Sequence, residues 1–108
     1  MMFMDIYITS KPQVEEKSLA YLGNNVDVVS EITDTVPYAK KNSEVLVNKG
    51  DLERLIKNLK MREDRMSSLA ETKFKEQRLK NIERGIEVLQ DILDNFDFEK
   101  NFLYIFYQ

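Results

Sequence analysis

The segment LKNIERGIEVLQDILDNF, residues 79–96, carries the clearest structural signal in the chain. Its apolar side chains recur every three or four residues, which places them on one face of a helix. These residues are Leu79, Ile82, Ile86, Leu89, Leu93 and Phe96, and Ile92 widens the stripe. The spacing predicts an amphipathic helix that ends near Asn95 or Asp97. Because the stripe covers fewer than three heptads, it does not require a coiled coil.

Two apolar strands are predicted at the ends of the chain. Residues 102–107, FLYIFY, are all apolar or aromatic, which is typical of a central strand that is covered on both faces. At the other end, residues 4–9 alternate, with Ile6 and Ile8 on the face opposite Tyr7. The first and last strands are therefore the most apolar of the predicted strands.

The elements between these strands are predicted from local signals. Ser10 and Gln13 form a capping-box pattern, with Pro12 in the first turn, and predict a short helix that ends near Leu22. Alternation from Val26 to Ile32 predicts a strand, and Glu44–Asn48 a third strand that forms a hairpin with it.

A second helical region follows the third strand. Asn48 and Asp51 predict a capped helix over residues 49–66, with an apolar stripe that consists of Leu52, Leu55, Ile56, Leu59 and Met66. Ser68 and Glu71 form another capping box, which predicts a break near Ser67 and a further helix over residues 68–95.

These elements predict a single α+β domain over residues 1–108. The order β-α-β-β-α(α)-β matches the ferredoxin-like arrangement, with a small mixed or antiparallel sheet of three or four strands and an extended C-terminal helical region. In that arrangement the first and last strands lie together in the middle of the sheet, which agrees with their apolar character. The architecture by itself indicates no function.

The composition excludes several kinds of chemistry. The chain has no cysteine and no histidine, so it lacks thiol nucleophiles, disulfides and the commonest general base and metal ligand. It also lacks a glycine-rich phosphate loop and a nucleophile elbow. We therefore expect neither an enzyme nor a cofactor-binding protein. The N-terminal residues do not resemble a signal peptide and no apolar run spans a membrane, so we expect a cytoplasmic protein, with Met4 as an alternative start.

Charge is distributed unevenly around a net value of −3. Residues 49–84 carry 11 basic and 7 acidic side chains, whereas residues 85–108 carry 1 basic and 5 acidic side chains. In the acidic part, Glu87, Asp91 and Asp94 share one helix face. This face is either a solvated surface, an acidic docking surface or a site for a divalent cation, although such sites usually need loop geometry and more oxygen ligands.

The basic part centres on a charged stretch with one large apolar residue. Its cations are Lys73, Lys75, Arg78, Lys80 and Arg84, interrupted by Glu71, Glu76 and Glu83. Three alternatives are open for these cations: a solvated helix with internal salt bridges, a surface that binds an acidic protein, or contacts with phosphates. The interrupting carboxylates do not favour a nucleic-acid site. Phe74 is either an exposed anchor for a partner or packs within a helical hairpin.

Aromatic residues are concentrated near the C-terminus. The cluster consists of Phe96, Phe98, Phe102, Tyr104, Phe106 and Tyr107. It forms either core or, through an apolar sheet face or the last strand's edge, a homodimer interface. Tyr38 is a further candidate contact in a loop.

Together these features predict a non-enzymatic protein–protein interaction module that regulates or inhibits a partner, such as a phage or mobile-element inhibitor of a host enzyme or defence system. The predicted partner-binding residues are Phe74, Lys73, Lys75, Arg78, Glu87, Asp91 and Asp94. Two alternatives remain open: a structural protein that self-assembles as a homo-oligomer, and a protein that sequesters a small ligand or nucleotide in a groove between sheet and helices.

Overall fold

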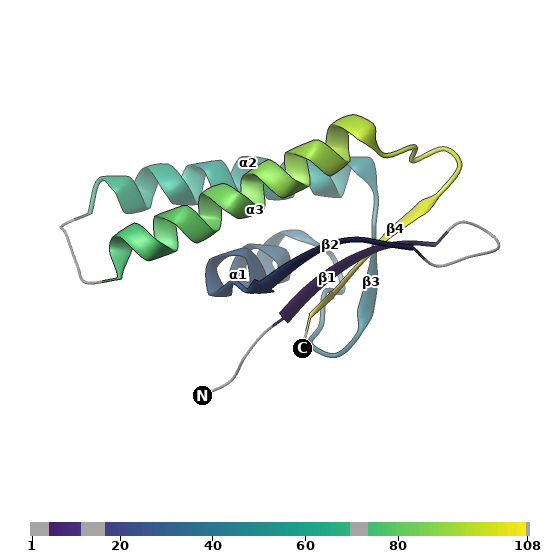
Figure 1. Cartoon of the computed structure of the whole chain (residues 1–108), viewed down its shortest axis with the longest axis horizontal. Coiled ribbons are helices and arrows are strands. Elements are labelled where there is room, and N and C mark those ends of the chain that lie inside the picture. Colours follow the sequence, from purple (N-terminus) through teal and green to yellow (C-terminus); the bar gives the residue numbers. More distant parts are fainter. Residues whose placement is uncertain (1–4, 12–16, 70–73, 108) are drawn as a thin grey trace.

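The computed structural model describes residues 5–11, 17–69 and 74–107, which form an α+β fold. All three helices of this described part lie on one side of a four-stranded antiparallel sheet (Figure 1). The elements in chain order are β1 (Asp5–Lys11), β2 (Lys17–Asn24), α1 (Val26–Thr35), β3 (Glu44–Val47), α2 (Lys49–Ser67), α3 (Lys75–Asn95) and β4 (Phe102–Tyr107).

The strand order in the sheet is β2-β1-β4-β3. β1 and β4 are therefore adjacent and central, as their apolar sequences predicted, and Ile8 lies opposite Ile105 in the ladder. β2 and β3 form the two edges. The pairing of β1 with β2 contains two register shifts, and such bulges make an edge strand a poor template for a further chain.

The core lies between the sheet and the helices. Along β4, Leu103, Ile105 and Tyr107 are buried and alternate with residues of higher exposure. The side chains that pack with them and are almost fully buried are Ile6, Ile8, Val28, Ile32, Val47, Leu52, Leu55, Leu59, Ile82 and Leu89. The stripe predicted in residues 79–96 therefore does face a core.

Residues 17–24 form strand β2, so the helix predicted to end near Leu22 is wrong. Ser10, its proposed cap, belongs to β1 and lies opposite both Lys17 and Leu103. Pairing with β1 satisfies the backbone groups of this segment in a sheet, which outweighs the local capping signal. The remaining residues of the predicted first turn, Pro12 and Gln13, lie outside the described residues.

Residues 26–35 form helix α1, so the strand predicted over 26–32 is also wrong. Asn25 caps the helix, because its side-chain oxygen accepts a hydrogen bond from the Val28 N–H at 3.3 Å. Its amide also donates to the Asn81 carbonyl at 2.8 Å, which ties the cap to α3. Since α1 separates β2 from β3, the predicted hairpin between the second and third strands does not form, and β3 pairs with β4.

The helical hairpin of α2 and α3 largely confirms the sequence pattern. The capping box of Asn48 and Asp51 is present, and the Asp51 N–H donates to the Asn48 side chain at 2.7 Å. The chain breaks where predicted, but Ser68 ends α2 and does not start α3, because its hydroxyl donates to the Arg65 carbonyl. Glu71 lies outside the described residues.

Candidate functional site

The structure gives Lys75 a role inside the fold. Its side chain is buried, and the ammonium donates hydrogen bonds to the carbonyls of Ser67 at 3.2 Å and Leu69 at 2.6 Å. Ser67 is the last residue of α2 and Leu69 follows the C-cap Ser68, so the ammonium lies at the end of a helix that has unpaired acceptors and partial negative charge. Lys75 therefore caps α2 from the start of α3. Lys73, its neighbour in the predicted partner-binding set, lies outside the described residues.

Arg78 takes part in an ion cluster that joins the three helices. Its Nη2 and Nε atoms donate to Asp27 of α1 at 2.8 and 3.1 Å. Arg62 of α2 donates to Asp27 at 2.9 Å and to Glu31 at 2.8 Å, and its Nη2 atom reaches the Ser30 hydroxyl at 3.0 Å. Asp27 is only 3% exposed, so its charge depends on these two guanidinium groups.

The electrostatics of this cluster follow from burial and charge. Burial alone would raise the pKa of Asp27, but hydrogen bonds and positive charge from Arg78 and Arg62 hold it below its usual value. Burial alone would lower the pKa of Arg62, but Glu31 and Asp27 raise it. The Asp27 hydrogen bond raises the pKa of Arg78. All three groups therefore stay charged at neutral pH. This suits ion pairs that hold helices together, whereas an acid–base catalyst works best with a pKa near the operating pH.

The three predicted carboxylates of α3 lie on its solvent face. Glu87, Asp91 and Asp94 are exposed, and hydrogen bonds within the helix join Asn95 to Asp91 and Gln90 to Asp94, both at 3.0 Å. Within the described residues, no group of three or more potential ligands could hold a metal ion. Their role as a docking surface remains a prediction.

Exposed apolar side chains mark the far end of the helical hairpin, which extends beyond the sheet (Figure 1). Phe74 is 65% exposed and Leu69 is 63% exposed. Of the two predicted alternatives for Phe74, exposure is therefore observed, and its contact with a partner remains a prediction. Tyr38, the predicted loop contact, is 95% exposed and has a φ of +64°, a backbone conformation that is uncommon for tyrosine.

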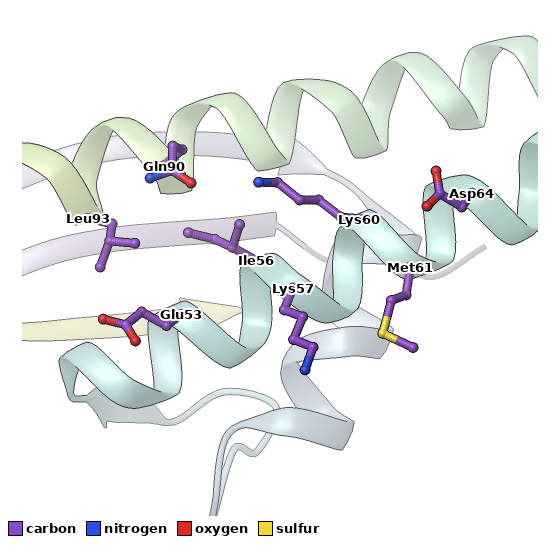
Figure 2. A pocket seen from close by; sticks show the side chains of 8 residues that line it. All are labelled: Glu53, Ile56, Lys57, Lys60, Met61, Asp64, Gln90 and Leu93. Carbon is purple, nitrogen blue, oxygen red and sulfur yellow. The ribbon is translucent and has the colours of Figure 1, made fainter.

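A shallow groove of about 350 Å³ runs along the solvent side of the hairpin. Figure 2 shows Ile56 of α2 pointing toward Leu93 of α3, with charged side chains around them. These charges are balanced, because Lys57 and Lys60 are accompanied by Glu53 and Asp64. This groove does not lie between sheet and helices, and its charge does not favour an anionic ligand. A smaller hollow of about 170 Å³ does lie between Leu19 of β2 and residues 91–96 at the end of α3, so the predicted ligand site there remains a prediction.

An apolar surface lies on the face of the described sheet that points away from the helices. We call it the outer face, and it consists of Tyr7, Tyr21, Leu46, Phe102, Tyr104 and Phe106. Tyr21, Leu46 and Phe102 are 51%, 50% and 54% exposed, and the others are half-buried against one another. Rings form a row across three strands, with centroid distances of 5.0 Å from Tyr7 to Tyr21 and 5.9 Å from Tyr7 to Phe106.

The aromatic cluster predicted near the C-terminus thus divides between two environments. Tyr107 is buried, with its hydroxyl 3.2 Å from that of Thr33, and Phe96 and Phe98 pack edge to face at 4.7 Å against the core. Phe102, Tyr104 and Phe106 lie on the outer face. Tyr21 and Leu46 were not predicted to lie there, because Tyr21 was predicted in a helix and no face was assigned to Leu46 in its predicted strand.

Comparisons with known proteins leave the function to be argued from these surfaces. No protein-family model matches the chain, and neither a curated protein nor a solved structure matches it significantly. Among the helices described, none combines the length and the apolar character that a membrane crossing needs.

Proposed function

We propose that this chain is a non-enzymatic protein-interaction module that regulates or inhibits a partner protein, and that it binds the partner through the outer face. The observation that carries the proposal is the contiguity of six apolar side chains on four adjacent strands, three of them at least half exposed. Apolar patches of this kind on soluble proteins commonly mark sites of interaction.

The composition of the outer face supports a protein as the partner. Tyrosine and phenylalanine give large contact areas at little cost in conformational entropy, and they are enriched at protein interfaces. Tyr7, Tyr21 and Phe106 form a connected row whose rings already restrain one another. A surface that is ordered before binding loses less entropy when the partner arrives.

The helical hairpin supports the proposal less strongly. Of the cations predicted to bind a partner, Lys75 caps α2 and Arg78 pairs with Asp27, so both already contribute to the fold. Phe74 remains the exposed anchor on this second surface. The two surfaces can be separated by experiment, because each carries an exposed phenylalanine.

The test compares Phe102→Ser on the outer face with Phe74→Ser on the hairpin. The two side chains are similarly exposed, at 54% and 65%, so both variants should fold. Partners captured from the native cell lysate are identified by mass spectrometry, and the affinity of the purified partner is then measured by calorimetry. We expect Phe102→Ser to weaken binding at least about tenfold, which corresponds to about 1.4 kcal/mol, and Phe74→Ser to leave it unchanged. The reverse result would assign binding to the hairpin and contradict the proposal.

A second function, self-assembly, is favoured by one observation. A face made of aromatic and aliphatic side chains is chemically complementary to a copy of itself, which is the requirement for a twofold dimer. Light scattering of the purified chain from about 10 to 200 μM distinguishes the two. A monomer over the whole range excludes self-assembly as the function.

A further inference from the structure

The sequence of β4 indicates that the outer face, like the face that packs on the helices, is covered by another element. All six residues, Phe102–Tyr107, are apolar or aromatic, which is typical of strands that are covered on both faces. In the described structure the helices cover only the face of Leu103, Ile105 and Tyr107. The opposite face of the same strand, which belongs to the outer face, is therefore also apolar. In the described part of this chain no element covers it.

The dimensions of the outer face match a single helix. Four strands about 4.8 Å apart span about 14 Å between the outermost strands, and six residues extend about 20 Å along a strand. A helix with its side chains is about 10–12 Å wide, and four turns extend about 22 Å. One amphipathic helix of about 14 residues is therefore large enough to cover the row of rings across three strands and the three outward-pointing rings along β4.

The area of the outer face distinguishes this occupant from a second copy of the chain. A large aromatic side chain can bury about 150–250 Å². With exposures near one half for Tyr21, Leu46 and Phe102, the face offers roughly 400 Å² in total. A stable dimer buries about 800 Å² on each partner, which is about twice what these side chains offer, so face-to-face pairing of two copies would need contacts beyond the outer face.

The charge on the described side chains of the outer face does not favour nucleic acid as the occupant. Nucleic-acid sites pair phosphates with lysine and arginine, even where aromatic rings stack on bases. Among the outward-pointing side chains that the structure describes on the four strands, Glu44 is the charged one, and it is an anion. A phosphate backbone would gain nothing from it, while an apolar helix surface is compatible with it.

We infer that the outer face binds an amphipathic helix of the partner protein, about four turns long, whose apolar side packs across Tyr7, Phe106 and Leu46. This inference rests on the proposed function and specifies which element of the partner docks. The helix is recognised by apolar side chains at intervals of three and four residues. It completes a three-layer arrangement in which helices cover both faces of the sheet.

The experiment uses a displayed library of 18-residue peptides that contains both helix-patterned and strand-patterned sequences. The full chain is the bait, and Phe102→Lys is the counter-bait. Enriched peptides are synthesised, and their affinities are measured by fluorescence anisotropy for the native chain and for two variants of equal exposure, Leu46→Lys on the outer face and Met61→Lys on α2. We expect helix-patterned peptides that lose at least tenfold in affinity with Leu46→Lys and less than twofold with Met61→Lys.

Three results would overturn the inference. The first is enrichment of peptides with apolar residues at every second position, which would show that a strand binds. The second is no enrichment, or binding that responds to Met61→Lys instead. The third is a dimer in solution that Phe102→Lys dissociates, which would make a second copy the cover. If a natural partner is lost with Phe102→Ser while no helical peptide binds, the inference fails and the proposed function stands.

Discussion

The two faces of strand β4 have nearly the same hydrophobicity and very different environments. Leu103 and Ile105 are at most 1% exposed, whereas Phe102, next to them in the chain, is 54% exposed. The difference arises from the helices, which cover one face of the sheet only (Figure 1). One face therefore stabilises the fold, and the other can change without much loss of stability. This separation would allow a small domain to keep the apolar binding surface that we propose.

The largest expected effect separates the two faces directly. Ile105→Ala removes buried methyl groups and leaves a cavity, so we expect the free energy of unfolding to fall by about 2–5 kcal/mol. Phe102→Ala on the same strand should cost about 1 kcal/mol or less, because half of that side chain is already in water. Urea denaturation followed by circular dichroism measures both values. Similar losses for the two variants would show that the outer face is packed as tightly as the core.

The next largest effect is expected where two of the helices that cover the buried face of the sheet touch each other. A Cβ atom at Gly85 would lie 2.7 Å from the Cγ2 atom of Val28, so α1 and α3 are in contact at this glycine. We expect Gly85→Ala to lower the free energy of unfolding by about 1–3 kcal/mol. Adding Val28→Ala should recover part of that loss, since the two positions compete for one space.

A matched control for the Gly85 variant is available at the start of α2. The nearest atom to a Cβ at Gly50 is the Asn48 side-chain oxygen at 3.4 Å, so Gly50→Ala should be neutral or stabilising by up to about 1 kcal/mol. If Gly85→Ala proves as well tolerated as this control, the close contact of α1 and α3 is not required for the fold.

The ion cluster predicts a dependence of stability on pH. Asp27→Asn should reduce the free energy of unfolding by about 1–2 kcal/mol at neutral pH, because two arginines lose a buried carboxylate. The pKa of Asp27 is lowered by folding, so its stabilisation is complete above the unfolded value of about 3.9 and is lost as the pH falls through the folded value. The native chain and Asp27→Asn should therefore converge in stability below about pH 4. A difference that grows with acidity would contradict this assignment.

The smallest change in stability is expected at the far end of the helical hairpin, because this end extends beyond the sheet. Lys75→Met removes the hydrogen bonds to the carbonyls of Ser67 and Leu69, which should cost about 1 kcal/mol. Hydrogen exchange should quicken in the last turn of α2 and stay unchanged in β1 and β4. Lys80→Met, whose pair with Glu76 is exposed on both sides, should have an effect below about 0.5 kcal/mol. Faster exchange throughout the sheet would show that the hairpin end is coupled to it.

The two long helices, the central strands and the short strand β3 were predictable from the sequence, whereas β2 and α1 were not. The helices α2 and α3 and the central strands were predicted because their patterns run over many residues or are apolar throughout. Residues 26–32 fit both an alternating strand and one face of a helix, and the deciding contacts come from Asn81 and Arg78, more than 50 positions away. A segment of seven residues does not contain that information.

The candidate site was predicted only in part, for related reasons. Exposure of Phe74 was one of two predicted alternatives, and the aromatic C-terminal segment was recognised as core or as an alternative interface. The pairing of Lys75 with the end of α2, and of Arg78 with Asp27, requires the folded helical layer and leaves no mark in local sequence. The outer face was missed as a unit because its members come from four strands, and one of these had been assigned to a helix.

The adjacency of the first and last strands has a consequence for how the chain acquires its structure. Ile6 lies opposite Tyr107, so the centre of the sheet joins residues about a hundred positions apart. Contacts of such sequence separation form slowly, because a long loop must close before they contribute. β1 cannot complete its pairing until β4 is available, about a hundred residues later in the chain, and before that only its pairing with β2 can form. We expect folding to be limited by the docking of β4 on β1, so that a variant truncated before Phe102 would lack the central pairing altogether.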